Sequence, residues 1–315
     1  MRDDDSTRGG RVPDPAARWM SAYDDAVPLA MLSIPGTHNS AAHHVSLPSV
    51  RCQRSSIREQ LDHGVRFLDF RLSKRYFPGI CTTSVSSTEL YAVHGAFPVC
   101  VTHTVSLVTL LGAVYGFLEQ HPSETVIISL KGEGPFRWAP HELADILWQT
   151  YIEPDCDRWV LDTRMPLLGA ARGKIVLFRR FACAPARHSS YGFPAQTWDY
   201  NTTGQDTVDG APLAVQDYCE LQSPREYRKK TELVTEHLRR AESMSSETLF
   251  LNFTSAAYFW NPRLWPRHIS NQIRDGIQST LRHTQGRCGI VILDFAEANN
   301  WALVSAIIEH NQILH

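Results

Sequence analysis

The feature of this sequence that most constrains its fold is a series of short apolar runs, each of which ends at a polar or charged residue. There are eight, at Leu29–Ile34, Val65–Phe70, Leu90–Val93, Thr125–Leu130, Lys174–Phe178, Leu213–Val215, Thr248–Phe253 and Gly289–Leu293. Continuous apolar runs bounded by turn residues are typical of strands that are buried on both faces of a parallel sheet. The sequence therefore predicts a sheet of eight such strands.

Helical patterns separate many of these runs. In the clearest one, apolar residues between Leu107 and Leu118 fall on one face at a period of 3.6 residues. Further helices are expected at 55–63, 140–150, 224–243, 266–283 and 299–310. Strands that alternate with helices along the whole chain predict an α/β fold, a single irregular (β/α)8 TIM barrel, with long loops in place of some helices.

The domain prediction is a flexible tail followed by one barrel. Residues 1–17 are polar and rich in glycine, proline and charge, which is typical of a flexible segment, and residues 18–315 form the barrel. No signal peptide is visible at this end, and we make no prediction of the compartment.

The composition excludes several classes of function. Lys plus Arg is 31 and Asp plus Glu is 33, with no basic block, so we expect no nucleic-acid partner. No apolar run reaches the roughly 18 residues that a membrane span needs. The 7 cysteines contain no C-x-x-C pair, so we expect no structural zinc site. One disulfide, between Cys81 and Cys100, stays conceivable.

In a TIM barrel the chemistry lies at the carboxyl ends of the strands. Reactive side chains follow the eight runs in order: His38 and Asn39, Asp69 and Arg71, His94, Lys131 and Glu133, Arg179 and Arg180, Asp217, Asn252 and Thr254, and Asp294. Two histidines without a cysteine cluster favour general acid–base chemistry over metal binding. Arginine and lysine beside them suit an anionic substrate such as a phosphate. The set predicts cleavage of a phosphodiester by an internal hydroxyl group.

Successive segments of the chain resemble one known family. They are LSIPGTHNS, LDHGVRFLDFRL, AVHGA, PSETVIISLK, RGKIVLFRRF, VQDY, LFLNFTSA and VILDFAE, in order from about Trp19 to the C-terminus. The chain resembles bacterial-type phosphatidylinositol-specific phospholipase C. The resemblance implies a barrel enzyme without metal or other cofactor, and it implies attack of the inositol 2-hydroxyl on phosphorus. The products would be diacylglycerol and a cyclic inositol phosphate, made by a monomer at a membrane surface.

The resemblance also implies a role for each site residue. His38 would be the general base, oriented by Asp294, and His94 the general acid. Arg71 would bind the phosphate with Asp69 beside it. The substrate-binding candidates are Lys131, Arg180, Asp217 and Tyr218, and Trp260 is the candidate membrane contact.

Two positions depart from the family pattern. Asn39 stands where the metal-independent members have an aspartate that supports the general acid, so we expect a less basic His94. Cys219 stands where they have a tyrosine that stacks on the inositol ring, and Tyr218 is adjacent. The headgroup preference is therefore open.

Two alternative functions remain. One is a metal-dependent phosphodiesterase acting on another lipid or on a glycerophosphodiester, which Arg71 disfavours because calcium-dependent relatives have a carboxylate there. The other is a non-catalytic lipid-headgroup binder, which the intact pair of His38 and His94 disfavours. The remaining histidines, such as His43, His44 and His103, are interpreted as structural or solvated.

Overall fold

Seven of the eight apolar runs form strands, and the first run only leads into one. In this computed structural model, which describes residues 15–74, 88–243 and 248–311, the strands that match the runs are β1 (Ile34–Thr37), β2 (Phe67–Ser73), β3 (Tyr91–His94), β5 (Val126–Gly132), β7 (Ile175–Arg180), β9 (Leu213–Gln216), β10 (Leu249–Phe253) and β11 (Ile290–Leu293). In the first run, Leu29–Met31 is a 3-10 helix and only Ile34 lies in β1. Three further strands of two residues each were not predicted: β4 (Phe97–Pro98), β6 (Trp159–Val160) and β8 (Phe193–Pro194).

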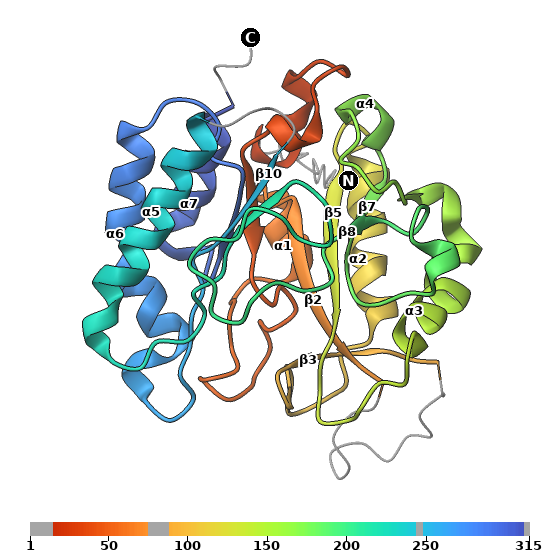
Figure 1. Ribbon diagram of the computed structural model, residues 1–315, viewed down its shortest axis with the longest axis horizontal. Coiled ribbons are helices and arrows are strands. Elements are labelled where there is room, and N and C mark those ends of the chain that lie inside the picture. Colours follow the sequence, from red (N-terminus) through yellow and green to blue (C-terminus); the bar gives the residue numbers. More distant parts are fainter. Residues whose placement is uncertain (1–14, 75–87, 244–247, 312–315) are drawn as a thin grey trace, which may run out of the picture.

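The sheet is parallel along its main path and curls into an irregular barrel (Figure 1). Its order is β6-β7-β5-β2-β1-β11-β10-β9, and β8 pairs with β7 beside β6. Within the described residues, no strand pairing joins β9 to β6 or β8. The expected irregular barrel is therefore confirmed. Its hydrogen-bonded wall is open between β9 at one end of the sheet and β6 and β8 at the other.

The third run is not a parallel barrel strand, and that part of the prediction was wrong. β3 pairs antiparallel with β2, through Leu72 opposite Ala92, and antiparallel with β4. The physical reason lies in the connection, which carries no apolar helical face to cover the sheet. A parallel neighbour needs a long crossover connection, usually a helix, whereas an antiparallel neighbour does not, so this sequence favours antiparallel pairing with β2. His94 therefore reaches the barrel mouth on a hairpin.

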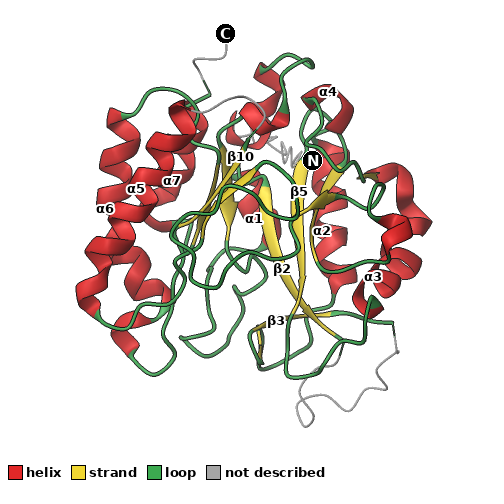
Figure 2. Cartoon of the chain, in the orientation of Figure 1, coloured by secondary structure: helices red, strands yellow, loops and turns green. Residues whose placement is uncertain are grey.

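Helices cover the outside of the sheet (Figure 2). They are α1 (Ile57–Asp62), α2 (Leu107–Gln120), α3 (Glu142–Ile146), α4 (Leu168–Ala171), α5 (Tyr227–Ser243), α6 (Pro266–His283) and α7 (Ala298–Glu309). Ser56 and Glu59 form a capping box at the start of α1, which satisfies backbone N–H groups of its first turn. No helix in the described ranges has the length and apolarity needed to cross a bilayer.

The folded part of the chain starts earlier than predicted. Residues Pro15–Ala22 form a 3-10 helix, which includes three residues assigned to the tail. Ala17 and Trp19 are buried, and the Trp19 indole donates to the carbonyl of Gly64 over 2.9 Å. Apolar burial by Ala17 and Trp19 outweighs the polar composition that suggested a flexible segment. The conceivable Cys81 bridge lies outside the described residues.

Candidate active site

The barrel interior changes from apolar to polar along each strand, and this change creates the site. Alternate residues of a strand point to the same face. In β2 the interior residue Phe67 is therefore followed on the same face by Asp69 and Arg71. The strand registers place Arg71 opposite Lys131 on β5, and Lys131 opposite Arg180 on β7. Three cations thus lie side by side at the carboxyl ends of adjacent strands.

A buried carboxylate, Asp69, lies beneath these cations. It accepts hydrogen bonds from Nε of Arg71 (3.0 Å), from the Ser129 hydroxyl (3.2 Å) and from the backbone N–H of Asn39 (3.2 Å). Nη1 of Arg180 is 3.7 Å from Oδ1 of Asp69, the oxygen that accepts from Ser129. Burial alone would raise the pKa of Asp69, but Arg71 and Arg180 outweigh burial and lower the pKa to about 2. Asp69 is therefore ionised and orients Arg71.

Glu133, which follows β5, is a second counter-ion of the site. It accepts from Arg71 and from Lys131, each over 2.8 Å, and from the backbone N–H of Gly95 over 2.9 Å. Burial opposes its ionisation, but Arg71 and Lys131 together hold the pKa of Glu133 well below its usual range. The carboxylate ties the hairpin that carries His94 to the end of β5.

His38 follows β1 and is held by the carboxylate of Asp294, which follows β11. Nδ1 of His38 lies 2.8 Å from Oδ1 of Asp294. Because an ionised carboxylate only accepts hydrogen bonds, this contact assigns the proton of the neutral ring to Nδ1. The opposite nitrogen, Nε2, is then a hydrogen-bond acceptor and is suited to act as a base.

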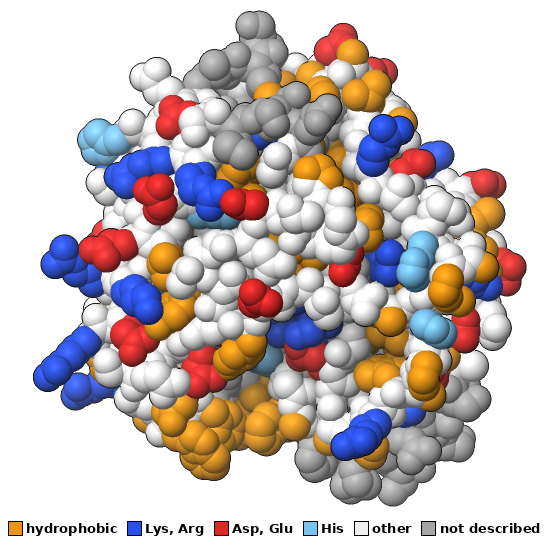
Figure 3. Space-filling view, in the orientation of Figure 1, with side chains coloured by type: hydrophobic (Ala, Val, Ile, Leu, Met, Phe, Trp, Pro, Cys, Tyr) orange, Lys and Arg blue, Asp and Glu red, His pale blue; other side chains and the backbone are white. Residues whose placement is uncertain are grey.

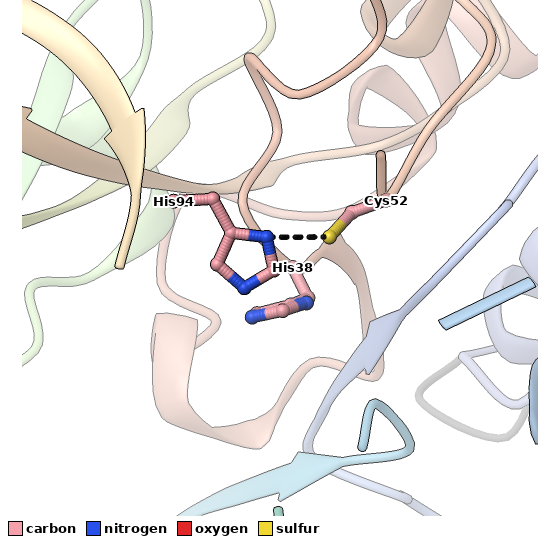
Figure 4. Close-up of side chains that lie close together, drawn as sticks. All are labelled: His38, Cys52 and His94. Atoms are coloured by element: carbon pink, nitrogen blue, oxygen red, sulfur yellow. Dashed lines mark hydrogen bonds between the residues drawn. The ribbon is translucent and has the colours of Figure 1, made fainter. Parts of the chain in front are cut away.

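His94 lies next to His38 at the end of β3, with ring centroids 5.4 Å apart and planes nearly perpendicular. Its Nδ1 donates to the Val50 carbonyl over 2.8 Å and lies 3.5 Å from the Cys52 sulfur (Figure 4). Burial, His38 and Arg71 lower the pKa of His94 to about 4. The reduced basicity expected for His94 therefore has burial as its largest cause.

The side chain of Asn39 does not contact the His94 ring in the described contacts. Its amide donates to the carbonyl of Val93, the residue before His94, over 3.2 Å. Asn39 adopts a left-handed backbone conformation with φ of 40°, which asparagine tolerates. It therefore acts on the strand that carries His94, while Val50 orients the ring.

These groups open into one cleft of about 380 Å³. Six predicted residues line it: His38, Arg71, His94, Lys131, Arg180 and Asp217. Asp69 and Asp294 lie beneath it as buried partners. Tyr218 was predicted to bind the substrate, but it does not line the cleft. Its hydroxyl donates to Glu226 on the outer side, as the alternation of side chains from Asp217 onward requires.

The sequence reasoning missed a whole wall of the cleft. Residues Gln196, Thr197, Trp198, Tyr200 and Asn201 line it from the long loop between β8 and β9. The Arg180 guanidinium lies 3.8 Å from the centroid of the Trp198 ring, and Trp198 donates to Asp217 over 2.9 Å. This loop does not directly follow one of the predicted strands. The only sequence feature that could have indicated its role in the cleft is the pair of aromatic residues, Trp198 and Tyr200, in a polar segment.

One set of metal-binding side chains lies in the cleft region, namely His38, Cys52 and His94 (Figure 4). However, Nδ1 of each histidine is already engaged, by Asp294 and by the Val50 carbonyl. Burial, followed by Asp294, raises the pKa of Cys52 well above its usual range, so the sulfur is a thiol. These contacts favour a proton-transfer site over a metal centre.

Comparison with known proteins finds similar sequences and a shared fold. Residues 27–181 match the family described as phosphatidylinositol-specific phospholipase C, X domain. The chain is 27% identical to the 1-phosphatidylinositol phosphodiesterase of Listeria monocytogenes over 308 residues, covering 94% of this chain and 85% of the relative. It is 25% identical to the protein of the same name from Staphylococcus aureus, covering 93% of this chain and 94% of the relative.

The fold is shared with solved structures. A variant of the phosphatidylinositol-specific phospholipase C of Staphylococcus aureus superposes with a TM-score of 0.79 at 24% identity, covering 96% of this chain and 99% of the other. The phospholipase from Listeria monocytogenes superposes with a TM-score of 0.70 at 23% identity, covering 94% and 99%. Both structures place the described chain in the same barrel fold.

Proposed function

The chain is of the bacterial phosphatidylinositol-specific phospholipase C type, and on that premise we propose that it cleaves phosphatidylinositol into diacylglycerol and a cyclic inositol phosphate. One observation carries the proposal. The rings of His38 and His94 lie 5.4 Å apart, and both line a cleft that Arg71 also lines. Two proton carriers and a guanidinium around one space are the set that phosphodiester cleavage needs.

The reaction begins with the sugar hydroxyl. Nε2 of His38 removes the proton of the inositol 2-hydroxyl as its oxygen attacks phosphorus. Asp294, 2.8 Å from Nδ1, stabilises the imidazolium that forms. The carboxylate also fixes the ring orientation, so that Nε2 points into the cleft before substrate arrives.

The leaving oxygen then takes a proton from His94. As the bond from the inositol oxygen to phosphorus forms, the bond from phosphorus to the glycerol oxygen breaks, and Nε2 of His94 protonates that oxygen. Arg71 stabilises the negative charge that develops on the non-bridging phosphate oxygens. The bond from His94 to the Val50 carbonyl is compatible with this role, because the imidazolium donates from both nitrogens.

The inositol hydroxyls are proposed to bind Lys131, Arg180 and Asp217. Cys219 lines the cleft where relatives have an aromatic ring, so another ring must form the wall against the sugar. Trp198 is covered on one face by Arg180, whereas Tyr200 lines the cleft and is 75% exposed. We propose that Tyr200 provides the stacking surface in this chain.

The low basicity of His94 leads to a pH-dependence prediction. With a pKa of about 4, roughly a thousandth of the free enzyme carries the proton of His94 at pH 7. A carboxylate in the variant Asn39→Asp favours the imidazolium and raises this pKa. The lowest-pH limb of the kcat/KM profile should therefore move to higher pH, and kcat/KM at pH 7 should rise on a soluble substrate.

The control for this variant is Asn39→Gly. Glycine adopts the φ of 40° without strain and removes the amide without adding charge. Its acidic limb should stay at the position of the parent enzyme. A profile that is the same in Asn39→Asp and the parent would show that residue 39 has no electrostatic effect on His94.

An apolar rim beside the cleft is the proposed membrane contact. The rim consists of the exposed apolar residues Val45, Leu47, Val101, Phe259 and Trp260. Loops 41–50 and 97–101 are joined by a hydrogen bond from Val101 to Val45, and Phe259 stacks on Phe97 with centroids 5.3 Å apart. Apolar side chains also gather at the lower edge of Figure 3, below the cleft. Such a patch suits the interface of a bilayer.

Replacing Trp260 with alanine should separate membrane binding from chemistry. Trp260 is 80% exposed and contacts Phe259 on the rim, so its removal subtracts apolar area from the interface and nothing from the cleft. We expect about tenfold to a hundredfold weaker binding to vesicles, from the roughly 1.5–3 kcal/mol of one large side chain. Turnover of a soluble short-chain substrate should be unchanged. The matched control is Leu167→Ala, which removes an exposed apolar side chain next to α4, away from the rim, and should bind vesicles as the parent does. An equal loss of activity of Trp260→Ala on vesicles and on the soluble substrate would contradict the membrane role of the rim.

Phosphorus NMR of phosphatidylinositol vesicles treated with the protein in chelator tests the function as a whole. A cyclic phosphodiester signal is expected, without added metal. Consumption of a different lipid instead would redirect the substrate, and activity that needs added metal would favour the metal-dependent alternative. Absence of any turnover, with retained vesicle binding, would favour a headgroup binder.

A further inference from the structure

A second cluster of metal-ligating side chains lies outside the cleft. His44, Cys100 and His103 each offer one ligand atom, and these three atoms lie within 4.8 Å of one another. The Cys100 sulfur is 3.2 Å from Nδ1 of His103, and the rings of His44 and His103 are nearly perpendicular with centroids 5.1 Å apart. The Thr102 hydroxyl lies 3.1 Å from the same Nδ1 and 3.3 Å from the Cys100 sulfur, and, unlike the carboxylate and the backbone carbonyl that hold the catalytic histidines, it can rotate away when a metal ion binds. None of the three lines the active-site cleft.

The donor set selects one class of ion. Two imidazoles and a sulfur suit zinc and similar transition metals, whereas calcium and magnesium need oxygen ligands. With metal–nitrogen bonds of about 2.0 Å and metal–sulfur bonds of about 2.3 Å, donor atoms of a tetrahedral site lie roughly 3.5 Å apart. The observed distance from Cys100 to His103 is close to that value. The ligand atom of His44 lies within 4.8 Å of the other two, so the three donors surround one space.

We propose that His44, Cys100 and His103 bind one zinc ion. The ion replaces the thiol proton of Cys100, which passes to solvent, and a water molecule takes the fourth position. His43 supports this geometry, since its ring packs against that of His44 with centroids 3.9 Å apart and limits its orientation. Cys100 and His103 are three positions apart, but His44 lies more than fifty positions before them, so the sequence shows only two of the three ligands together and the histidines were interpreted as structural or solvated.

The site joins the two loops that carry part of the apolar rim. His44 precedes Val45, and Cys100 precedes Val101, and these two valines are linked by the backbone hydrogen bond of 3.0 Å. Ser46 also donates to the Pro98 carbonyl over 3.1 Å. A metal ion bound next to these contacts would cross-link the loops and hold the exposed valines in place. This consequence rests on the proposed membrane function, whereas the metal site itself does not.

Cobalt binding to the full-length chain tests the site directly, because tetrahedral cobalt reports both its geometry and a thiolate ligand in its absorption spectrum. Titration with Co²⁺ should give one ion per chain and a thiolate-to-cobalt charge-transfer band, and Zn²⁺ should displace it. His103 is exposed, so His103→Ala should fold normally and weaken binding by more than about tenfold. The control is His283→Ala, an exposed histidine at the end of α6, which should bind as the parent does.

Two results would overturn the metal site. One is a titration of the parent chain without a charge-transfer band, and the other is unchanged affinity in His103→Ala. If Cys52→Ser removes the band while His103→Ala keeps it, the ion lies between the catalytic histidines and the assignment to Cys100 is wrong. A soluble-substrate assay is not needed for any of these results, so they stand apart from the proposed function.

Phosphatidylcholine vesicles test the link to the rim, since they allow binding to be measured without turnover of phosphatidylinositol. The parent chain loaded with Zn²⁺ should bind them more tightly than the chelated protein, and His103→Ala should show no difference between the two conditions. Equal vesicle binding of the loaded and chelated parent, with the cobalt band present, would overturn the rim consequence.

Discussion

Replacing His38 with alanine is expected to lower kcat by about 10²–10⁴-fold, the range for loss of a positioned general base. Binding to phosphatidylinositol vesicles should be unchanged, because His38 lies inside the cleft and the rim residues are untouched. The measurement is turnover of a soluble substrate together with vesicle sedimentation. A variant that turns over as fast as the parent would show that His38 is not the base.

A second variant separates chemistry from folding. In Asp294→Asn the partner of His38 keeps its shape, but an amide replaces the carboxylate. Because an amide can accept or donate a hydrogen bond, it no longer fixes the proton of the neutral ring on Nδ1. We expect a loss of activity in Asp294→Asn as well, with a melting temperature close to that of the parent. Loss of activity that tracks loss of the folded state in both variants would point to a structural role for the pair.

The barrel was predictable because burial on both faces of a strand leaves a continuous apolar run. This signal located β2, β5, β7, β10 and β11. It also identified the residues that follow the runs, and the strand register places two of them, Arg71 and Lys131, side by side. Burial of a strand is visible in the residues of the strand itself, so a single sequence is enough to predict it.

The remaining parts of the site depend on contacts between distant segments. The direction of β3 is set by its antiparallel pairing with β2, which no property of the run itself reveals. Glu133 is buried because Arg71 and Lys131 need a counter-ion, and its own neighbours in sequence suggest a solvated loop. Trp198 and Tyr200 meet the cleft only because the barrel wall is open beside β9.

The second large effect concerns Arg71, whose guanidinium is oriented before substrate binds. Its Nε donates to Asp69 and its Nη1 donates to Glu133, and within the described residues Nη2 makes no side-chain hydrogen bond, so we propose that Nη2 donates to the phosphate. Lysine keeps the charge but has a single nitrogen, which cannot serve two carboxylates and a phosphate together. We therefore expect Arg71→Lys to lower kcat/KM by about 10²–10³-fold, as loss of a positioned oxyanion donor does.

The control for charge alone is Arg58→Lys, at an exposed ion pair with Asp62 on α1, which should retain full activity. Chelator should leave the parent unaffected, because the guanidinium supplies the positive charge that a metal ion would supply in a metal-dependent enzyme. Activity of the parent that is lost in chelator and restored by calcium would contradict this role. So would an Arg71→Lys variant as active as the parent, since a point charge would then suffice and the two carboxylates that hold the guanidinium would have no catalytic purpose.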